Sequence, residues 1–202
     1  MILSINETNP QPRNIQRVAA FLKEGGLIAY PTDTHYGIGC DITNKKAIER
    51  VHLLMQRDKS KPFSFICSDL KHISDYAKVS NYGYRMLKKL LPGPYTFILD
   101  GSKMVPKLML TKRKTAGIRV PDNPICHAIV EELGNPILTA TASLPGEDPL
   151  NNAWSIEDTF GHALDVVIDG GDVPEIPSSI VSLIDDEPEV IREGAGDISM
   201  FL

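Results

Sequence analysis

The segment Tyr30–Gly39, which reads Tyr-Pro-Thr-Asp-Thr-His-Tyr-Gly-Ile-Gly, constrains the fold of this 202-residue chain more than any other part. It directly follows the apolar run Leu27–Ala29, so the sequence predicts a buried strand that ends in a turn fixed by Pro31. The turn carries hydroxyls and a carboxylate, and two glycines after it allow the backbone to approach a ligand closely. Small polar groups after a strand are typical of ligand sites in α/β sheets. An ordinary Asx-type turn uses the same residue types, so the pattern alone leaves both interpretations open.

Composition and length indicate an ordinary globular protein. Hydrophobic residues make up 42% of the chain and charged residues 23%, and no repeat, linker or low-complexity segment divides it. The 202 residues can bury a core without disulfides or metals. There is no signal-like leader and no apolar run long enough to span a bilayer. We therefore expect a single domain over residues 1–202, located in the cytoplasm as a monomer or weak dimer.

Strand and helix patterns follow one another irregularly, without the regular order of βαβ units. Apolar periodicity predicts helices over residues 10–24, 44–56, 69–77, 84–91, 103–110, 123–133 and 156–160. Short apolar or alternating runs predict strands over residues 27–30, 63–67, 95–99, 117–120, 137–141, 166–168, 180–184 and 190–191. We therefore predict an α/β (α+β) fold, in which helices flank a twisted, open sheet of mixed parallel and antiparallel strands.

Neither the cysteines nor the histidines are spaced as metal ligands. The three cysteines, Cys40, Cys67 and Cys126, are far apart and predict buried, reduced thiols. The five histidines form no HxxH or HExxH pattern, so no metal held by protein side chains is expected. The sequence also lacks a Walker-type loop and an obvious covalent nucleophile. An enzyme with this sequence would act by positioning its substrates and stabilising charge.

The net charge of −5 conceals three blocks of different charge. Residues 1–56 carry a net charge of +1, residues 57–119 carry +10 and residues 120–202 carry −16. A basic block suits a polyanion such as a nucleotide or a nucleic acid. Binding of RNA through residues 57–119 would depend strongly on salt. The alternative is that the blocks neutralise one another across one folded surface.

Two groups of cationic residues lie where an anion could be held. Arg57 and Lys61 lie between a predicted helix and a predicted strand, where cations can bind phosphate, although such charges are more often only solvated. Arg119 lies inside the short apolar strand Gly117–Val120, where an unpaired guanidinium would be costly. Either an internal carboxylate or a ligand anion must therefore pair with Arg119.

Small hydroxyls and one further arginine lie in the acidic part of the chain. Alternation places Thr141 and Ser143 on one face at the end of a predicted strand, where they either donate to phosphate or ribose or simply face water. Ser179 precedes another predicted strand. Arg192 is the only Lys or Arg within residues 120–202, so it serves either a salt bridge or a ligand.

Taken together, these motifs resemble the YrdC/YciO superfamily, the threonylcarbamoyl-AMP synthases and their relatives. Residues 30–39 are similar to the signature Tyr-Pro-Thr-Asp-Thr-x-Tyr-Gly-Leu-Gly, and further family elements follow in order as Pro92–Thr96, Gly117–Pro121 and Arg192–Gly194. The similarity covers nearly the whole chain, and its ending and length look most like the YciO branch. It implies a YrdC-like fold with a concave, positively charged cleft.

The resemblance implies a nucleotidyltransferase that acts in tRNA modification. Synthases of the family make threonylcarbamoyl-AMP from L-threonine, bicarbonate and ATP and release pyrophosphate, and the product is used to form threonylcarbamoyladenosine in tRNA. ATP would then be a substrate, and Mg²⁺ would arrive with it rather than in a site made by the protein. Carried over by motif, the threonine-binding residues are Thr34, Tyr36 and Arg119, with Arg119 on the amino-acid carboxylate.

The resemblance also implies roles for the remaining candidates. Arg57 and Lys61 would be the catalytic residues that face the phosphates and bicarbonate. The residues that would bind the nucleotide are Thr141, Ser143, Ser179 and Arg192. Family members are also described as binding double-stranded RNA on a positive surface, which the basic block of residues 57–119 would supply.

Two residues depart from the synthase pattern. Met55 stands where synthases carry the lysine of Lys-x-Arg, and Ser143 stands where they carry the asparagine of Ser-x-Asn. Loss of one group that stabilises transition-state charge typically costs roughly 10²–10³ in rate. The sequence is therefore compatible with a threonylcarbamoyl-AMP synthase. It is also compatible with a YciO-type protein that binds nucleotide or double-stranded RNA and has weak or no synthase activity.

Overall fold

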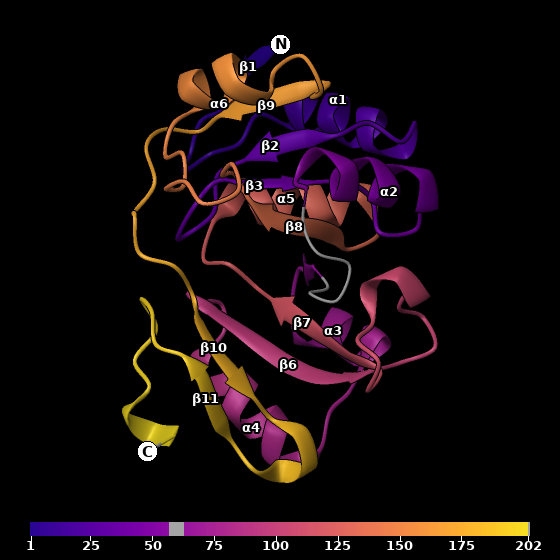
Figure 1. Cartoon of the computed structure of the whole chain (residues 1–202), viewed down its shortest axis with the longest axis vertical. Coiled ribbons are helices and arrows are strands. Elements are labelled where there is room, and N and C mark those ends of the chain that lie inside the picture. Colours follow the sequence, from indigo (N-terminus) through magenta and orange to yellow (C-terminus); the bar gives the residue numbers. More distant parts are fainter. Residues whose placement is uncertain (57–62, 202) are drawn as a thin grey trace.

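Within residues 1–56 and 63–201, which the computed structural model describes, eleven strands join into one sheet (Figure 1). The strands are β1 (Ile2–Ser4), β2 (Ile28–Tyr30), β3 (Gly37–Gly39), β4 (Ser64–Ile66), β5 (Ala77–Lys78), β6 (Tyr95–Gly101), β7 (Thr115–Arg119), β8 (Ile137–Thr141), β9 (Val166–Asp169), β10 (Ser179–Ser182) and β11 (Glu189–Arg192). The α-helices of the same residues are α1 (Pro12–Lys23), α2 (Lys45–Leu54), α3 (Leu70–Tyr76), α4 (Asn81–Leu90), α5 (Pro124–Leu133) and α6 (Ala153–Phe160).

The order of the strands across the sheet is β1-β9-β2-β3-β8-β4-β7-β6-β10-β11, and β5 pairs with β6. Four neighbouring pairs are parallel, namely β1 with β9, β2 with β9, β4 with β7, and β6 with β10. The other neighbours are antiparallel. The predicted mixed sheet with flanking helices is therefore confirmed.

Figure 1 shows two regions that meet near the middle of the sheet. One contains β1, β9, β2, β3 and β8 with helices α1, α2, α5 and α6, and the other contains β7, β6, β10 and β11 with α3 and α4. After β9 the chain leaves the first region and runs alongside the second as β10. The turn that follows β2 and the ends of β7 and β8 lie where the two regions meet.

Buried hydrophobic side chains form two cores, and both contact the part of the sheet that contains β2. On β2, Ile28 and Tyr30 belong to the core beneath α1 and α5, whereas Ala29 between them belongs to the core on the other face. All three are fully buried. This explains why residues 27–30 read as a continuous apolar run, because a strand buried on both faces has no polar alternation.

Side-chain caps begin five of the six α-helices of the described residues, and two of these, α4 and α6, begin at Asn81 and Ala153, three residues before their predicted starts. Asn44 accepts a hydrogen bond from the Ala47 N–H at 3.1 Å and begins α2 as predicted. The first helix differs, because it begins at Pro12 rather than at Pro10. Asn9, just before the predicted start of this helix, donates its backbone N–H to the side chain of Asn6 at 2.7 Å, in a turn that precedes the helix.

The predicted helix over residues 103–110 is wrong. Only a single 3-10 turn forms there, over Lys107–Met109, and Pro106 precedes it with an extended ψ of 138°. A proline lacks the N–H that would continue a helix through this point and restricts the residue before it. The sequence analysis also missed β1, β3 and β5, which are two or three residues long and too short for a periodic signal.

Candidate functional site

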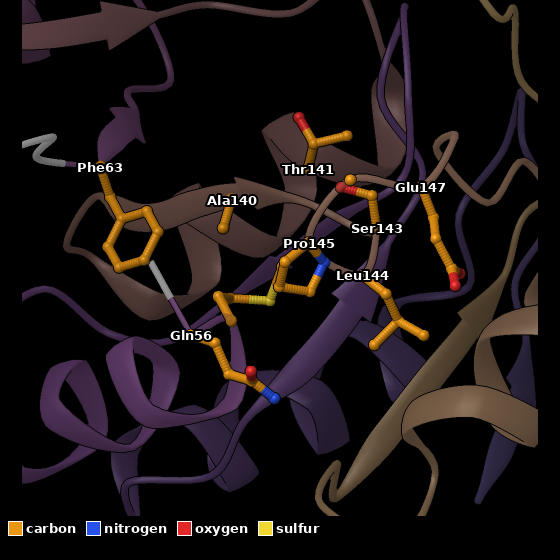
Figure 2. A pocket seen from close by; sticks show the side chains of 10 residues that line it. Gln56, Phe63, Ala140, Thr141, Ser143, Leu144, Pro145 and Glu147 are labelled. Atoms are coloured by element: carbon orange, nitrogen blue, oxygen red, sulfur yellow. The ribbon is translucent and has the colours of Figure 1, made fainter. Parts of the chain in front are cut away.

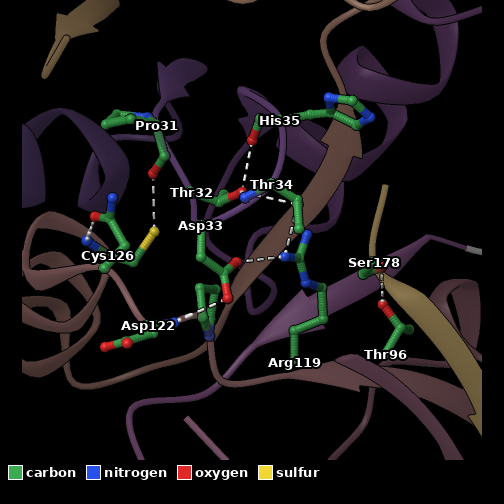
Figure 3. Close-up of polar contacts among 12 residues, drawn as sticks. Pro31, Thr32, Asp33, Thr34, His35, Thr96, Arg119, Asp122, Cys126 and Ser178 are labelled. Carbon is green, nitrogen blue, oxygen red and sulfur yellow. Dashed lines mark hydrogen bonds and ion pairs between the residues drawn. The ribbon is translucent and has the colours of Figure 1, made fainter. Parts of the chain in front are cut away.

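The turn after β2 binds the arginine at the end of β7 (Figure 3). Arg119 Nη2 donates to Asp33 Oδ1 at 2.8 Å and to Thr34 Oγ1 at 3.0 Å. Asp33 Oδ2 accepts the backbone N–H of Asp122 at 3.1 Å. These residues (Asp33, Thr34, Arg119 and the backbone of Asp122) are called the Arg119 cluster below. The internal carboxylate, one of the two alternatives that the sequence left open, is thus present.

Burial makes this ion pair different from a surface salt bridge. The side chains of Arg119 and Asp33 are each 9% exposed. Arg119 Nε is buried and has no hydrogen-bond partner among the described residues, although a guanidinium carries five N–H donors. Buried donors are normally satisfied. The cluster therefore presents a fixed, partly unused donor of the kind that binds a carboxylate.

Neighbouring hydroxyls hold the turn in shape. The Thr32 hydroxyl donates to the His35 carbonyl at 2.6 Å, and it accepts the Thr34 N–H at 3.1 Å. Because its single hydrogen goes to His35, the Thr34 hydroxyl donates in the 3.2 Å contact between the two threonines. Thr34 thus donates to Thr32 and accepts from Arg119, so its hydroxyl would have to exchange a partner to bind a ligand.

Tyr36 is fixed by the backbone after β9. Its hydroxyl donates to the Gly171 carbonyl at 2.8 Å and accepts the Gly170 N–H at 3.3 Å. Burial raises the pKa of Tyr36 to about 12, so the hydroxyl remains a donor at neutral pH. The predicted role of Tyr36 in a threonine pocket stays a prediction, and its visible role is to join this turn to the end of β9.

The glycines of the signature serve strand packing in this structure. A Cβ on Gly37 would lie 2.9 Å from Cζ of Tyr30, and one on Gly39 would overlap the carbonyl oxygen of Leu138 on β8. Tyr30 in turn donates its hydroxyl to that carbonyl at 3.0 Å. The close approach expected at these glycines is therefore between β3 and its neighbours.

A pocket of about 330 Å³ lies beside the ends of α2 and β8 (Figure 2). Its described lining contains both residues that depart from the synthase pattern, Met55 and Ser143, together with Thr141. The remaining described lining residues are Gln56, Phe63, Ala140, Leu144, Pro145, Gly146 and Glu147. The thioether of Met55 is 8% exposed, and no Lys or Arg is among these ten residues. This is called the Met55 pocket below.

The pocket and the Arg119 cluster are joined through β3. Gly37 pairs with Thr141 in the ladder between β3 and β8, and the Ala142 N–H donates to the Tyr36 carbonyl at 2.9 Å. Residues Thr34–Gly37 therefore connect Arg119 with the hydroxyls of Thr141 and Ser143. The structure brings these predicted threonine-binding and nucleotide-binding residues into one region, although the pocket does not include Arg119.

The other two candidates, Ser179 and Arg192, connect β10 with the C-terminal segment. The fully buried Ser179 hydroxyl donates to the Gly196 carbonyl at 2.6 Å and accepts the Gly194 N–H at 3.0 Å. Arg192 donates to the Ser178 carbonyl through Nε at 3.1 Å and through Nη2 at 2.7 Å. These bonds give both side chains a structural role, and their binding of a nucleotide stays a prediction.

Some candidates lie outside the described residues, and some residues were missed. Arg57 and Lys61, predicted as catalytic, both fall in the segment 57–62 that the structure does not describe. The sequence analysis missed Asp33 as the partner of Arg119, although it lies within the signature itself. It also missed His35, which is 8% exposed and whose pKa is lowered by burial and by the nearby charges of Arg119 and Arg192.

The cysteines are reduced and buried, as predicted. Burial raises the pKa of Cys40 to about 12 and raises that of Cys126 further, so neither is a thiolate at neutral pH. Across the part of the chain that the structure describes, no group of three or more His, Cys, Asp or Glu side chains is arranged to hold a metal ion. No helix in the same part has the length and apolar composition needed to cross a membrane.

Comparisons with known proteins agree on one family. The Sua5_yciO_yrdC family model, described as "Telomere recombination", matches residues 20–194. The uncharacterized protein YciO of Escherichia coli (strain K12) is 42% identical over 200 residues, covering 98% of this chain and 97% of that protein. The crystal structure of E. coli YciO matches with a TM-score of 0.95, covering 100% of this chain and 99% of the other.

Synthases of the family are more distant. A threonylcarbamoyl-AMP synthase of Vibrio vulnificus (strain YJ016) is 31% identical over 160 residues, covering 78% of this chain and 86% of the synthase. The crystal structure of Sua5 from P. abyssi complexed with L-threonine matches with a TM-score of 0.90 at 26% identity. It covers 96% of this chain and 57% of the Sua5 chain. On this evidence the chain belongs to the Sua5/YciO/YrdC family.

Proposed function

We propose that the chain is a nucleotidyltransferase of the threonylcarbamoyl-AMP synthase type, which acts in the tRNA modification pathway of the cytoplasm. Its substrates would be L-threonine, bicarbonate and ATP, and its products would be threonylcarbamoyl-AMP and pyrophosphate. The observation that carries the proposal is the Arg119 cluster. A buried guanidinium is held by Asp33 and Thr34 and keeps one donor unused, beside hydroxyls that lead to a pocket. The relationship to a Sua5 that binds L-threonine supports this assignment.

Each candidate residue would have a role that fits its chemistry. Arg119 would hold the carboxylate of threonine, and Thr34 would supply a neighbouring hydroxyl. The amino group of threonine would attack the carbon of bicarbonate, and water would leave to give a carbamate. A carbamate oxygen would then attack the α-phosphorus of ATP, and pyrophosphate would leave. Thr141 and Ser143 at the Met55 pocket would donate to the nucleotide. Arg57 and Lys61 stay the proposed partners of its phosphates.

The nucleotide would carry Mg²⁺ on its phosphate oxygens. A metal bound in this way needs few protein ligands. Glu147 is the one carboxylate in the described lining of the pocket, so it would be the carboxylate available to such an ion there. When bound, the ion would neutralise phosphate charge, and the residues above would do the positioning.

The Met55 pocket favours a second candidate function, that of a YciO-type protein that binds a nucleotide or double-stranded RNA with little or no synthase activity. A buried thioether replaces the ammonium group that the synthases carry, and Phe63, Leu144 and Pro145 make the same wall apolar. Such a surface does little to stabilise phosphate charge, but it can accept a nucleobase. The basic residues within 57–119 would then supply contacts to RNA phosphates.

One assay separates the two functions. Pyrophosphate release from ATP is measured with and without threonine and bicarbonate, for the wild-type chain and for Met55→Lys. Met104→Lys is the matched control, because Met104 is 63% exposed and does not line the pocket. Threonine-dependent release by the wild type supports the synthase. Release by Met55→Lys but not by the wild type supports the second candidate, a binding protein. If neither chain releases pyrophosphate, the proposed synthase function is contradicted.

A further inference from the structure

The carboxylate of Asp33 is a fixed part of the Arg119 cluster. Its two oxygens have separate partners, since Oδ1 accepts from Arg119 Nη2 at 2.8 Å and Oδ2 accepts from the Asp122 N–H at 3.1 Å. Figure 3 shows Asp33 between Arg119 and Asp122, so that it joins the turn after β2 to the segment after β7. The side chain is 9% exposed, so burial and these two hydrogen bonds together fix its position.

Pairing with Asp33 changes what Arg119 attracts. A buried guanidinium without a partner would attract every small anion, including bicarbonate, phosphate and simple carboxylates, because its field is poorly screened. With Asp33 beside it the pair has no net charge. The directional donors remain, since Nε is buried and has no hydrogen-bond partner among the described residues. The cluster thus keeps the hydrogen bonds that recognise a carboxylate and loses much of the attraction for bare negative charge.

We propose that Asp33 makes the Arg119 site selective for zwitterionic amino acids over carboxylates that lack an ammonium group. The inference rests on the proposed function, in which Arg119 receives the carboxylate of threonine. A zwitterion carries an ammonium group a few bonds from its carboxylate, so Asp33 attracts the ammonium group while it repels the carboxylate. From Asp33, a simple carboxylate experiences only repulsion. Asp33 therefore acts as a positioning and discriminating residue.

The matched ligands are L-threonine and 3-hydroxybutanoate, which is threonine without its amino group. Their affinities are measured by calorimetry for the wild-type chain, Asp33→Asn and Asp33→Glu. Asp165→Asn is the control variant, since Asp165 also accepts a backbone N–H (Leu27, 2.8 Å) and pairs with an arginine (Arg50, 3.7 Å) away from the cluster. If Asp33 only joined two segments, its substitution would weaken the binding of both ligands equally. A discriminating residue changes the ratio of their affinities.

We expect the wild type to prefer threonine by at least tenfold. Asp33→Asn should reduce this preference about tenfold, chiefly by binding 3-hydroxybutanoate more tightly. Asp33→Glu keeps the charge and should keep most of the preference even if both ligands bind more weakly, and Asp165→Asn should match the wild type. If the ratio of the two affinities is unchanged in Asp33→Asn, the inference about Asp33 is overturned, but the proposed function is not.

The wild-type chain gives a test that no folding defect in a variant can obscure. Equal wild-type affinities for threonine and 3-hydroxybutanoate overturn the role of Asp33, because a charge-neutral site should separate them. Absence of wild-type binding to either ligand overturns the proposed function and this inference with it. The two failures are therefore distinguished by whether the wild type binds threonine at all.

Discussion

The Arg119 cluster and the Met55 pocket lie on either side of residues Thr34–Gly37 and are built in opposite ways. In the cluster, the charged and hydroxyl groups of Asp33, Thr34 and Arg119 bond to one another at 2.8–3.0 Å and are almost completely buried. In the pocket, Thr141 is exposed and Ser143 is half-exposed, and the wall behind them is made of apolar side chains. One region is held by hydrogen bonds and charge, and the other is held by packing.

This difference explains where the chain departs from the synthase pattern. A substitution in the Arg119 cluster would leave a buried charge or a buried donor without a partner, which is among the most costly changes in a protein. A substitution in the wall of an open pocket alters only packing and solvation. Both departures, Met55 and Ser143, line the pocket, and none is found among the side chains of the cluster. The proposed threonine end of the site is thus preserved, and the proposed nucleotide end is altered.

Arg119→Ala is the strongest test of this comparison. The substitution leaves the Asp33 carboxylate buried without its ion-pair partner, so we expect a loss of about 3–5 kcal/mol in the free energy of unfolding. It should also abolish binding of threonine. Denaturant unfolding and calorimetry measure the two effects.

The control is Arg50→Ala. Arg50 pairs with Asp165 at 3.7 Å, but the two side chains are 49% and 40% exposed, so the loss should stay within about 1 kcal/mol. Equal losses for the two arginines would show that burial does not distinguish the cluster from a surface pair.

Restoring the synthase residues in the pocket is the second test. We expect the double variant Met55→Lys/Ser143→Asn to raise threonine-dependent pyrophosphate release up to about 10²-fold, since one or two groups that stabilise transition-state charge are returned. Rates at saturating ATP and threonine measure the gain. The same double variant combined with Arg119→Ala should return to background, and activity that survives there would place threonine recognition elsewhere.

The sequence predicted the framework of the site better than its internal contacts. The strand 27–30, the turn after it and the hydroxyls at the end of β8 followed from local patterns and were confirmed in position. The pairing of Asp33 with Arg119 was not predicted, because the two residues are 86 positions apart and only the sheet topology brings them together. Local patterns likewise gave no means of choosing between the internal carboxylate and a ligand anion as the partner of Arg119.

Ser179 and Ser143 provide a third, smaller test, with one serine from each kind of environment. Ser179→Ala removes a buried hydroxyl that bonds to both the Gly196 carbonyl and the Gly194 N–H, so it should cost about 1–3 kcal/mol. Ser143→Ala at the half-exposed pocket wall should change stability by less than about 0.5 kcal/mol. Thermal and denaturant unfolding compare them directly. An unchanged stability of Ser179→Ala would show that these two hydrogen bonds do not stabilise the fold.

The smallest expected effect is a pH dependence of stability that is due to His35, beside the Arg119 cluster. Burial lowers the pKa of His35, and the charges of Arg119 and Arg192 lower it further. As the pH falls below the ordinary pKa of 6.5, His35 therefore binds a proton more readily in the unfolded chain than in the folded chain. The contribution of His35 to stability is present above pH 6.5 and is lost as the pH falls. His35→Gln should reduce the slope of stability against pH in this range.

His72 gives the matched comparison. Burial also lowers its pKa, whereas the neighbouring charges of Asp69 and Asp75 act to raise it. His72→Gln should likewise flatten the slope. In the Arg119→Ala background the effect of His35→Gln should shrink, since one of the charges that disfavours its protonation is gone, whereas the effect of His72→Gln should not change. If Arg119→Ala left the effects of both His→Gln substitutions on this slope unchanged, the charge of Arg119 would not influence the protonation of His35.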